Sequence, residues 1–129
     1  MEKAKKTIAI LEDDHQLREV LTNFLTAKGF EVYGAPSGFD IVKDVFARKP
    51  DLIITDLGLQ GASGDQVVKT LKVRNLLPQT PVIVISALGP DEIAQAVKSL
   101  EAVAALPKPF DNEKLLTLVK QHILGAPAV

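Results

Sequence analysis

The chain contains no cysteine and no tryptophan, and only 5% of its 129 residues are aromatic. The absence of cysteine excludes a disulfide scaffold, a thiolate metal site and a cysteine nucleophile, and it fits a reducing compartment. A strong excess of one charge is also missing, because 15 Lys and Arg stand against 16 Asp and Glu. Without a positive field, we expect neither direct nucleic-acid binding nor attachment to an anionic membrane.

Long hydrophobic runs are missing as well. No apolar stretch reaches the roughly 18 residues of a membrane span, and the charged segment 1–6 does not lead into a signal-peptide apolar region. Hydrophobic residues make up 47% and charged residues 24%, which is a globular balance. We therefore expect one soluble, cytoplasmic domain over residues 1–129, with its core at about 6–124 and a tail at 125–129.

Two apolar patterns alternate five times along the chain. Short β-rich runs predict strands, and the segments between them carry apolar residues spaced three and four apart, which predicts helices. The strands are expected at residues 7–11, 30–33, 51–55, 81–85 and 102–106. The apolar positions of the helices include Leu17, Val20, Leu21, Phe24, Leu25, Phe46 and Leu71. Helix starts are predicted at Asp14, Ser37, Ser63, Pro90 and Asp111.

Five strand–helix units in sequence predict the fold class. The runs at 51–55 and 81–85 are apolar along their length, as strands covered on both faces must be. Right-handed crossovers then give a parallel sheet with helices on both sides. The expected fold is α/β, a doubly wound five-stranded parallel sheet of the (βα)5, flavodoxin-like kind, with strand order 2-1-3-4-5.

Reactive side chains follow four of the five predicted strands. They are Glu12, Asp13 and Asp14 after the first strand, Asp56 after the third, Ser86 after the fourth and Lys108 after the fifth. Ligands of such a sheet bind outside the carboxyl ends of its strands, at the switch point between strands 1 and 3. We therefore expect these groups to gather at one edge of the sheet.

The chemistry of this group points to phosphoryl transfer. Its four carboxylates would repel one another unless they hold protons or a cation, and oxygen ligands alone suit Mg²⁺ or Mn²⁺. The backbone carbonyl of Gly58 could supply a further ligand. A carboxylate, a metal ion, a hydroxyl and a lysine together match transfer of a phosphoryl group onto the carboxylate. In this interpretation Asp56 becomes a transient aspartyl phosphate, whose oxygens contact Ser86 and Lys108.

The sequence resembles the receiver domain of two-component response regulators over about residues 6–124. The motifs that carry the resemblance are ILEDD at 10–14, DLIITDLGL at 51–59, VIVISA at 82–87 and LPKPF at 106–110. The resemblance implies that Glu12 and Asp13 are the acidic pair, with Asp13 the more direct metal ligand. It also implies that Asp56 is the phosphoacceptor, Ser86 the switch hydroxyl and Lys108 the family's lysine, followed by a commonly cis bond to Pro109.

The same resemblance implies a function. A sensor histidine kinase or histidine phosphotransfer protein would donate a phosphoryl group to Asp56 in a Mg²⁺-dependent reaction. The modified phosphoprotein would switch the face formed by its fourth helix, fifth strand and fifth helix, which contacts an effector domain or protein. Such a module is not a product-releasing enzyme, since it catalyses only its own phosphotransfer and dephosphorylation. About five residues follow the last helix, so we expect no output domain in this chain.

Three positions depart from the family pattern. Ala105 stands where a Tyr or Phe is usual, Gln60 stands where a Pro is usual, and residues 100–106 carry one charge in place of an acidic run. An aromatic side chain at position 105 therefore cannot carry the signal. We also expect a flexible loop after the phosphoacceptor and a less charged output face with a different partner.

Other functions stay open at this stage. A receiver fold that acts as a phosphorylation-independent interaction module is the main alternative, and reaction with acetyl phosphate would separate the two. An FMN-binding flavodoxin would need a phosphate-binding loop where Glu12–Asp14 stand. A hydrolase with an aspartyl nucleophile would need a second acid where Leu57 and Gly58 follow Asp56.

Single residues also have simpler interpretations. Asp14 is expected to cap the first helix rather than to bind metal. His15 is expected at the surface, and His122 near the end of the last helix, where positive charge is favourable.

Overall fold

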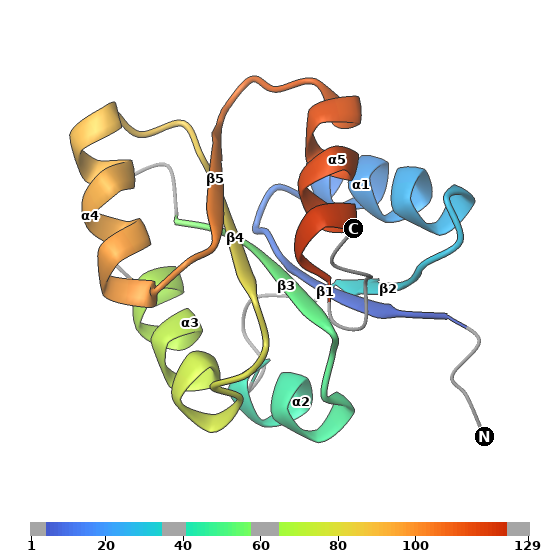
Figure 1. The fold of residues 1–129 in the computed structure, drawn as a ribbon, viewed down its shortest axis with the longest axis horizontal. Helices are drawn as coiled ribbons and strands as arrows, with labels where there is room; N and C mark the ends of the chain where they lie inside the picture. The colour runs from blue at the N-terminus through green and yellow to red at the C-terminus, as the bar shows by residue number, and fades with distance from the viewer. Residues whose placement is uncertain (1–4, 35–40, 58–64, 124–129) are drawn as a thin grey trace.

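The computed structural model describes residues 5–34, 41–57 and 65–123. Five parallel strands form one sheet in the order β2-β1-β3-β4-β5 (Figure 1). The elements are β1 (Thr7–Leu11), α1 (His15–Ala27), β2 (Glu31–Gly34), α2 (Ile41–Arg48), β3 (Leu52–Asp56), α3 (Asp65–Leu76), β4 (Val82–Ser86), α4 (Pro90–Leu100), β5 (Ala104–Pro107) and α5 (Asn112–His122). The predicted fold class and strand order are confirmed.

Helices cover both faces of the sheet (Figure 1). Helices α1 and α5 lie together on one face, and α2, α3 and α4 lie on the other. Alternate residues of β1 divide between the two layers, because successive side chains of a strand point to opposite faces. Ile8 and Ile10 pack with α1 and α5, while Ala9 and Leu11 pack with α2 and α3. Strands β1, β3 and β4 are buried along their whole length, as the sequences of β3 and β4 predict.

Helix starts agree with the predicted caps where the structure describes them. Asp14 accepts the backbone N–H groups of Gln16 and Leu17 at 3.0 and 3.2 Å, and Asp111 accepts that of Glu113 at 2.8 Å. These contacts satisfy N–H groups that have no partner within the helix. The predicted starts at Ser37 and Ser63 lie outside the described residues.

Some predicted details differ from the structure. Val20, Phe46 and Leu71 are 50%, 38% and 39% exposed, although the apolar pattern included them. Val20 lies at the margin of its stripe, and the sheet covers only the part of α1 that carries Leu21 and Leu25. Strand β5 also begins two residues later than predicted, and as an edge strand it is only half-buried.

None of the helices in the described part of the chain combines the length and the apolar character of a membrane span.

Candidate functional site

The predicted reactive residues come to one edge of the sheet. Asp56 and Ser86 are the last residues of β3 and β4, while Glu12 and Lys108 directly follow β1 and β5. Because the four strands are parallel, their carboxyl ends point the same way. Strand β3 lies between β1 and β4, so Asp56 is at the centre of this edge, beside the switch point between β1 and β3.

Lys108 joins the two buried carboxylates. Its Nζ lies 2.7 Å from Glu12 Oε1 and 3.6 Å from Asp56 Oδ2. The side chains of Glu12 and Asp56 are 1% and 3% exposed, and that of Lys108 is 14% exposed. The backbone N–H of Lys108 donates to the carbonyl of Ser86, and the Lys108–Pro109 peptide bond is cis, as expected. One ammonium is thus shared by two carboxylates from different strands.

Glu12 is held at several points. Besides the contact with Lys108, its Oε2 accepts the backbone N–H of Asp14 at 3.0 Å. Burial raises the pKa of Glu12 above its usual value, while the hydrogen bonds from Lys108 and Asp14 lower it and the nearby charge of Asp56 raises it. The net direction is upward. Burial therefore disfavours the charged form of Glu12 even though Lys108 contacts it.

Asp56 carries an unused acceptor. Its Oδ1 is buried and has no hydrogen-bond partner among the described residues. A buried polar atom without a partner costs stability, and such atoms in native structures call for an explanation such as an ion or a reaction. A cation or an incoming electrophile would satisfy this oxygen.

Ser86 is fully buried at the end of β4. Its Oγ accepts the backbone N–H of Leu88 at 3.0 Å. A hydroxyl that accepts one hydrogen bond keeps its own proton to donate. Ser86 can therefore donate to an anionic oxygen at the same edge of the sheet.

The structure brings together only part of the predicted set. Glu12, Asp56 and Lys108 are in contact, and Ser86 ends the strand beside Asp56. Asp13 is exposed to solvent, and Gly58 lies outside the described residues. Within the described ranges, no three His, Cys, Asp or Glu side chains form a group arranged to hold a metal. The two buried carboxylates supply the hard oxygen donors that suit Mg²⁺ or Mn²⁺.

Neighbouring acidic and histidine residues have the simpler roles expected for them. Asp14 caps α1, as described above, and its carboxylate takes no part in the contact with Lys108. His15 is exposed, with Nε2 lying 3.7 Å from Glu19 Oε2. His122 is the last residue of α5, as predicted.

Arg18 is a contact of the site that the sequence did not reveal. Its Nη1 donates to the backbone carbonyl of Glu12 at 2.7 Å. An arginine in the first turn of a helix is unremarkable in sequence, and its reach to this carbonyl depends on the fold. No signal short of the tertiary structure would have identified it.

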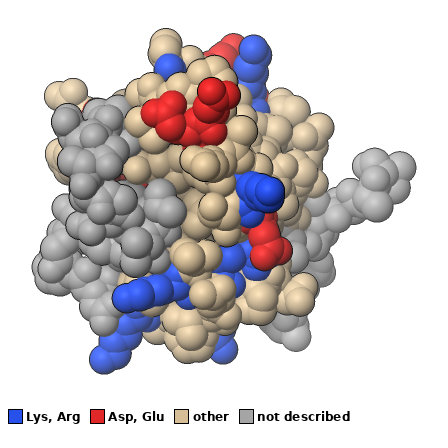
Figure 2. Space-filling view, turned by 90° about the vertical axis from the view of Figure 1, so that its left-hand side faces the viewer, with Lys and Arg blue, Asp and Glu red and all other residues tan. Residues whose placement is uncertain are grey.

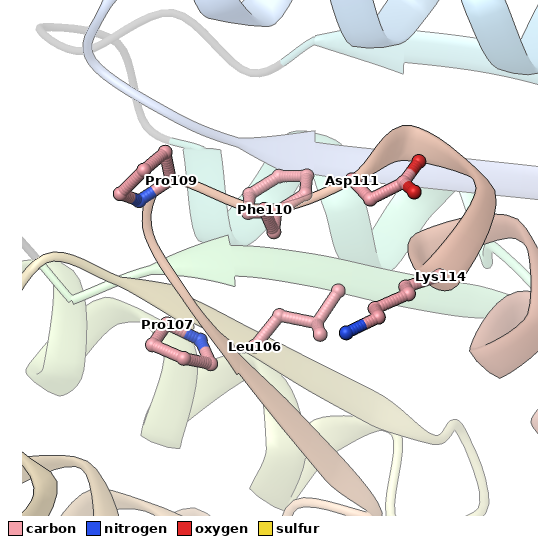
Figure 3. Close-up of a pocket in the computed structure, with 6 residues that line it drawn as sticks. All are labelled: Leu106, Pro107, Pro109, Phe110, Asp111 and Lys114. Carbon is pink, nitrogen blue, oxygen red and sulfur yellow. The ribbon is translucent and has the colours of Figure 1, made fainter.

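Two pockets flank the segment after β5. The first, of about 390 Å³, is lined by loop residues that include Asp14, Ala87 and Lys108, so it opens onto the site. The second, of about 380 Å³, is drawn in Figure 3 and is lined by Leu106, Pro107, Pro109, Phe110, Asp111 and Lys114. Neither Glu12 nor Asp56 lines this second pocket. Of the two, only the first is lined by Lys108, the residue that contacts both buried carboxylates.

The surface over α4 carries its charge mainly at the ends of the helix. Figure 2 shows an acidic group near the top of this side of the molecule and a second acidic side chain lower down, beside a basic one, with uncharged surface between the two. The exposed charged residues at the start of α4 are Asp91 and Glu92, and those at its end are Lys98 and Glu101. Exposed Ala94, Gln95 and Ser99 lie between them.

Comparison with known proteins gives consistent matches. The family described as response regulator receiver domain matches residues 8–120. The chain is 28% identical to sporulation initiation phosphotransferase F of Bacillus subtilis (strain 168) over 90% of this chain and 92% of that protein. It is 31% identical to the DNA-binding transcriptional regulator NtrC of Klebsiella pneumoniae, covering 88% of this chain but only 24% of the relative. This chain thus spans about a quarter of NtrC.

Solved structures agree on the fold. The response regulator protein TrrA from Thermotoga maritima, solved in complex with Mg(2+)-BeF, superposes with a TM-score of 0.76 at 24% identity. The superposition covers 92% of this chain and 99% of that one.

Proposed function

The chain belongs to the response regulator receiver domains of two-component systems, and from that premise we propose that Asp56 is the residue that accepts a phosphoryl group. The donor is a phosphohistidine of a sensor histidine kinase or a histidine phosphotransfer protein. The observation that carries the proposal is the buried Oδ1 of Asp56, which has no hydrogen-bond partner in the described part of the chain and belongs to the carboxylate beside the Lys108 ammonium. A carboxylate oxygen that lacks a partner is available as a nucleophile.

The proposed step conserves atoms and charge. An oxygen of Asp56 forms a bond to phosphorus, and the bond from phosphorus to the donor's imidazole nitrogen breaks. The imidazole leaves with the electron pair and takes up a proton. Lys108, whose Nζ lies 3.6 Å from Asp56 Oδ2, and the Ser86 hydroxyl then bind the phosphoryl oxygens. The hydrolysis that ends the signal uses water at the same phosphorus.

A divalent cation fits the donors of this site. In the proposed arrangement Glu12, Asp13, Asp56 and the backbone carbonyl of Gly58 would hold Mg²⁺, or Mn²⁺, which would supply positive charge to the phosphoryl oxygens. Two buried carboxylates that share one lysine, and an oxygen of Asp56 that has no hydrogen-bond partner among the described residues, support a cation at this edge. The Mg(2+)-BeF complex of TrrA is consistent with this assignment.

The surroundings of the site suggest how partners meet it. The donor histidine enters through the pocket of about 390 Å³ that Lys108 lines. Phosphorylation then biases the loop after β4 and the α4-β5-α5 face between two states, and that face contacts an effector domain or protein. The module works in the cytoplasm as a single domain, and its only catalysis is its own phosphotransfer and dephosphorylation.

Intact-mass measurement tests the acceptor. Incubation with acetyl phosphate and Mg²⁺ should add one phosphoryl group to the wild-type chain and none to Asp56→Asn. The exposed Asp111→Asn variant is a matched control, because Asn caps a helix as well as Asp does. EDTA should abolish the gain in mass.

Two outcomes would reject the proposal. The first is a mass gain that survives in Asp56→Asn, which would place the acceptor elsewhere. The second is no gain in the wild type at any Mg²⁺ concentration, which would favour the interaction-only module.

Hydrogen exchange with and without beryllofluoride tests the switch, since unchanged protection of α4, β5 and α5 would contradict it.

A further inference from the structure

Arg18 of α1 holds the backbone of the acidic turn that follows β1. Its Nη1 donates to the carbonyl oxygen of Glu12 at 2.7 Å. The carboxylate of the same residue is held by Lys108 and by the backbone N–H of Asp14. Glu12 is therefore fixed at both its main chain and its side chain. The carbonyl that Arg18 binds belongs to the peptide bond between Glu12 and Asp13.

The position of the Arg18 side chain depends on Gly34. Helix α1 and strand β2 are neighbours in the fold (Figure 1), and Gly34 is the last residue of β2. A Cβ placed on Gly34 would lie 2.5 Å from Cδ of Arg18 and 3.0 Å from its Cγ and Nε. The backbone at Gly34 is not in the left-handed region, so the role of this glycine is the space that it leaves.

A second contact orients the guanidinium. Nη2 of Arg18 lies 3.1 Å from Nδ1 of His15, on the same helical turn. Arg18, His15 and Gly34 also line a surface pocket of about 320 Å³. The side chain thus passes the end of β2, with Nη1 directed at the turn after β1 and Nη2 at His15.

We propose that Arg18 is a positioning residue for the acidic turn, and that Gly34 is required because it leaves Arg18 room to reach the carbonyl of Glu12. The proposal rests on the proposed function, since the turn that is positioned carries two of the proposed cation ligands. Contacts outside the ligand set that orient ligands typically change metal affinity by 10- to 100-fold. We expect an effect near the lower end, because Arg18 acts on the main chain.

The sign of the effect separates positioning from charge. Arg18→Met removes a positive charge near the acidic turn, which by Coulomb's law alone would tighten cation binding. Loss of the hydrogen bond that positions the acidic turn would instead weaken cation binding. Gly34→Ala keeps the charge of Arg18 and displaces only its side chain, so a shared loss of affinity in both variants points to the hydrogen bond to Glu12.

A double-mutant cycle tests the proposal without any phosphoryl transfer. Free Mn²⁺ is counted by electron paramagnetic resonance during titration of the wild type, Arg18→Met, Gly34→Ala and the double variant. Each single variant should bind Mn²⁺ about tenfold more weakly, and the double variant should bind no more weakly than Arg18→Met. Lys28→Met, which removes an exposed charge at the far end of α1, should leave the affinity unchanged.

A metal-free measurement accompanies the titration. In ¹⁵N relaxation experiments, the amides of Asp13 and Asp14 should become more mobile in both single variants, while far-UV circular dichroism and the melting temperature stay close to wild type. Gly34→Ala provides the test if Arg18→Met fails to fold, because the three atoms nearest to the added Cβ all belong to the flexible side chain of Arg18.

Each outcome has a definite meaning. Unchanged Mn²⁺ affinity in both single variants, or tighter binding in Arg18→Met, would overturn the positioning role while leaving the proposed function intact. Additive losses in the double variant would overturn the link between Gly34 and Arg18. A wild-type chain that neither binds Mn²⁺ nor accepts a phosphoryl group would instead overturn the proposed function.

Discussion

Replacing Lys108 by methionine would leave two buried carboxylates without the cation that lies between them. Nζ is 2.7 Å from Glu12 Oε1 and 3.6 Å from Asp56 Oδ2. At an effective dielectric constant of 20 these pairs amount to roughly 6 and 5 kcal/mol of gross attraction. The desolvation of the ammonium offsets much of this attraction, and removal of one partner from a buried pair typically lowers the free energy of unfolding by about 3–5 kcal/mol.

Protonation sets a ceiling on this loss. Without Lys108, the pKa of Glu12, already raised by burial, rises further. Neutralising this carboxyl at pH 7, against its usual value of 4.5, requires roughly 3.4 kcal/mol, from 2.5 pH units at about 1.36 kcal/mol each. The variant should therefore lose at most about 3 kcal/mol relative to wild type at pH 7. At pH 5 the same neutralisation requires only roughly 0.7 kcal/mol, so the difference between wild type and variant should shrink as the pH falls.

Urea unfolding followed by far-UV circular dichroism measures this difference, since the chain has no tryptophan to serve as a fluorescence probe. Lys72→Met, which removes an exposed lysine of α3, is the matched control and should stay within about 0.5 kcal/mol of wild type. The reasoning is refuted if Lys108→Met is as stable as wild type at pH 7, or if it is equally destabilised at pH 5 and pH 7.

Two further predictions concern buried polar groups. Glu12→Gln should raise the free energy of unfolding at neutral pH, because a carboxyl whose folded pKa is raised destabilises the fold when it is ionised. The gain should be absent below pH 4.5, grow as the pH rises toward the raised pKa and level off above it. A urea midpoint at or below that of wild type at neutral pH would contradict it. Thr55→Val should lower the free energy of unfolding by about 1–2 kcal/mol, because it removes the buried hydroxyl that lies 2.9 Å from that of Thr70. The double variant Thr55→Val, Thr70→Val should recover most of this loss in the same assay. No recovery would show that the two hydroxyls act separately.

The fold could be predicted from the sequence because its signals are local and repeated. The strands that become β1, β3 and β4 are short apolar runs, and parallel strands buried on both faces require that composition. Five alternations then leave few topologies open, because crossovers are right-handed. The exposure of Val20 could not be predicted in this way, since periodicity gives the apolar stripe of α1 but not the width of the sheet that covers it.

The meeting of Glu12, Asp56 and Lys108 could also be predicted, because a parallel sheet brings the residues after its strands to one edge. The contact of Arg18 with Glu12 could not. It requires a long side chain to cross the end of β2 at a position where Gly34 has no Cβ, and neither residue carries a local signature of the other. Such contacts depend on the distance between elements, which a single sequence does not encode in any simple pattern.

The stability of the fold and the chemistry of the site make opposite demands on Glu12. The rigid, fully buried strands β1 and β3 deliver its carboxylate and that of Asp56 into a place where water cannot solvate them and one lysine is shared between them. Nothing in the packing of the core needs this charge, since a neutral isostere fits the same space. If Glu12→Gln gains stability but binds divalent cations more weakly, the acidity of this edge is maintained for ligand binding at the expense of folding, as is common where binding sites are built from unsatisfied groups.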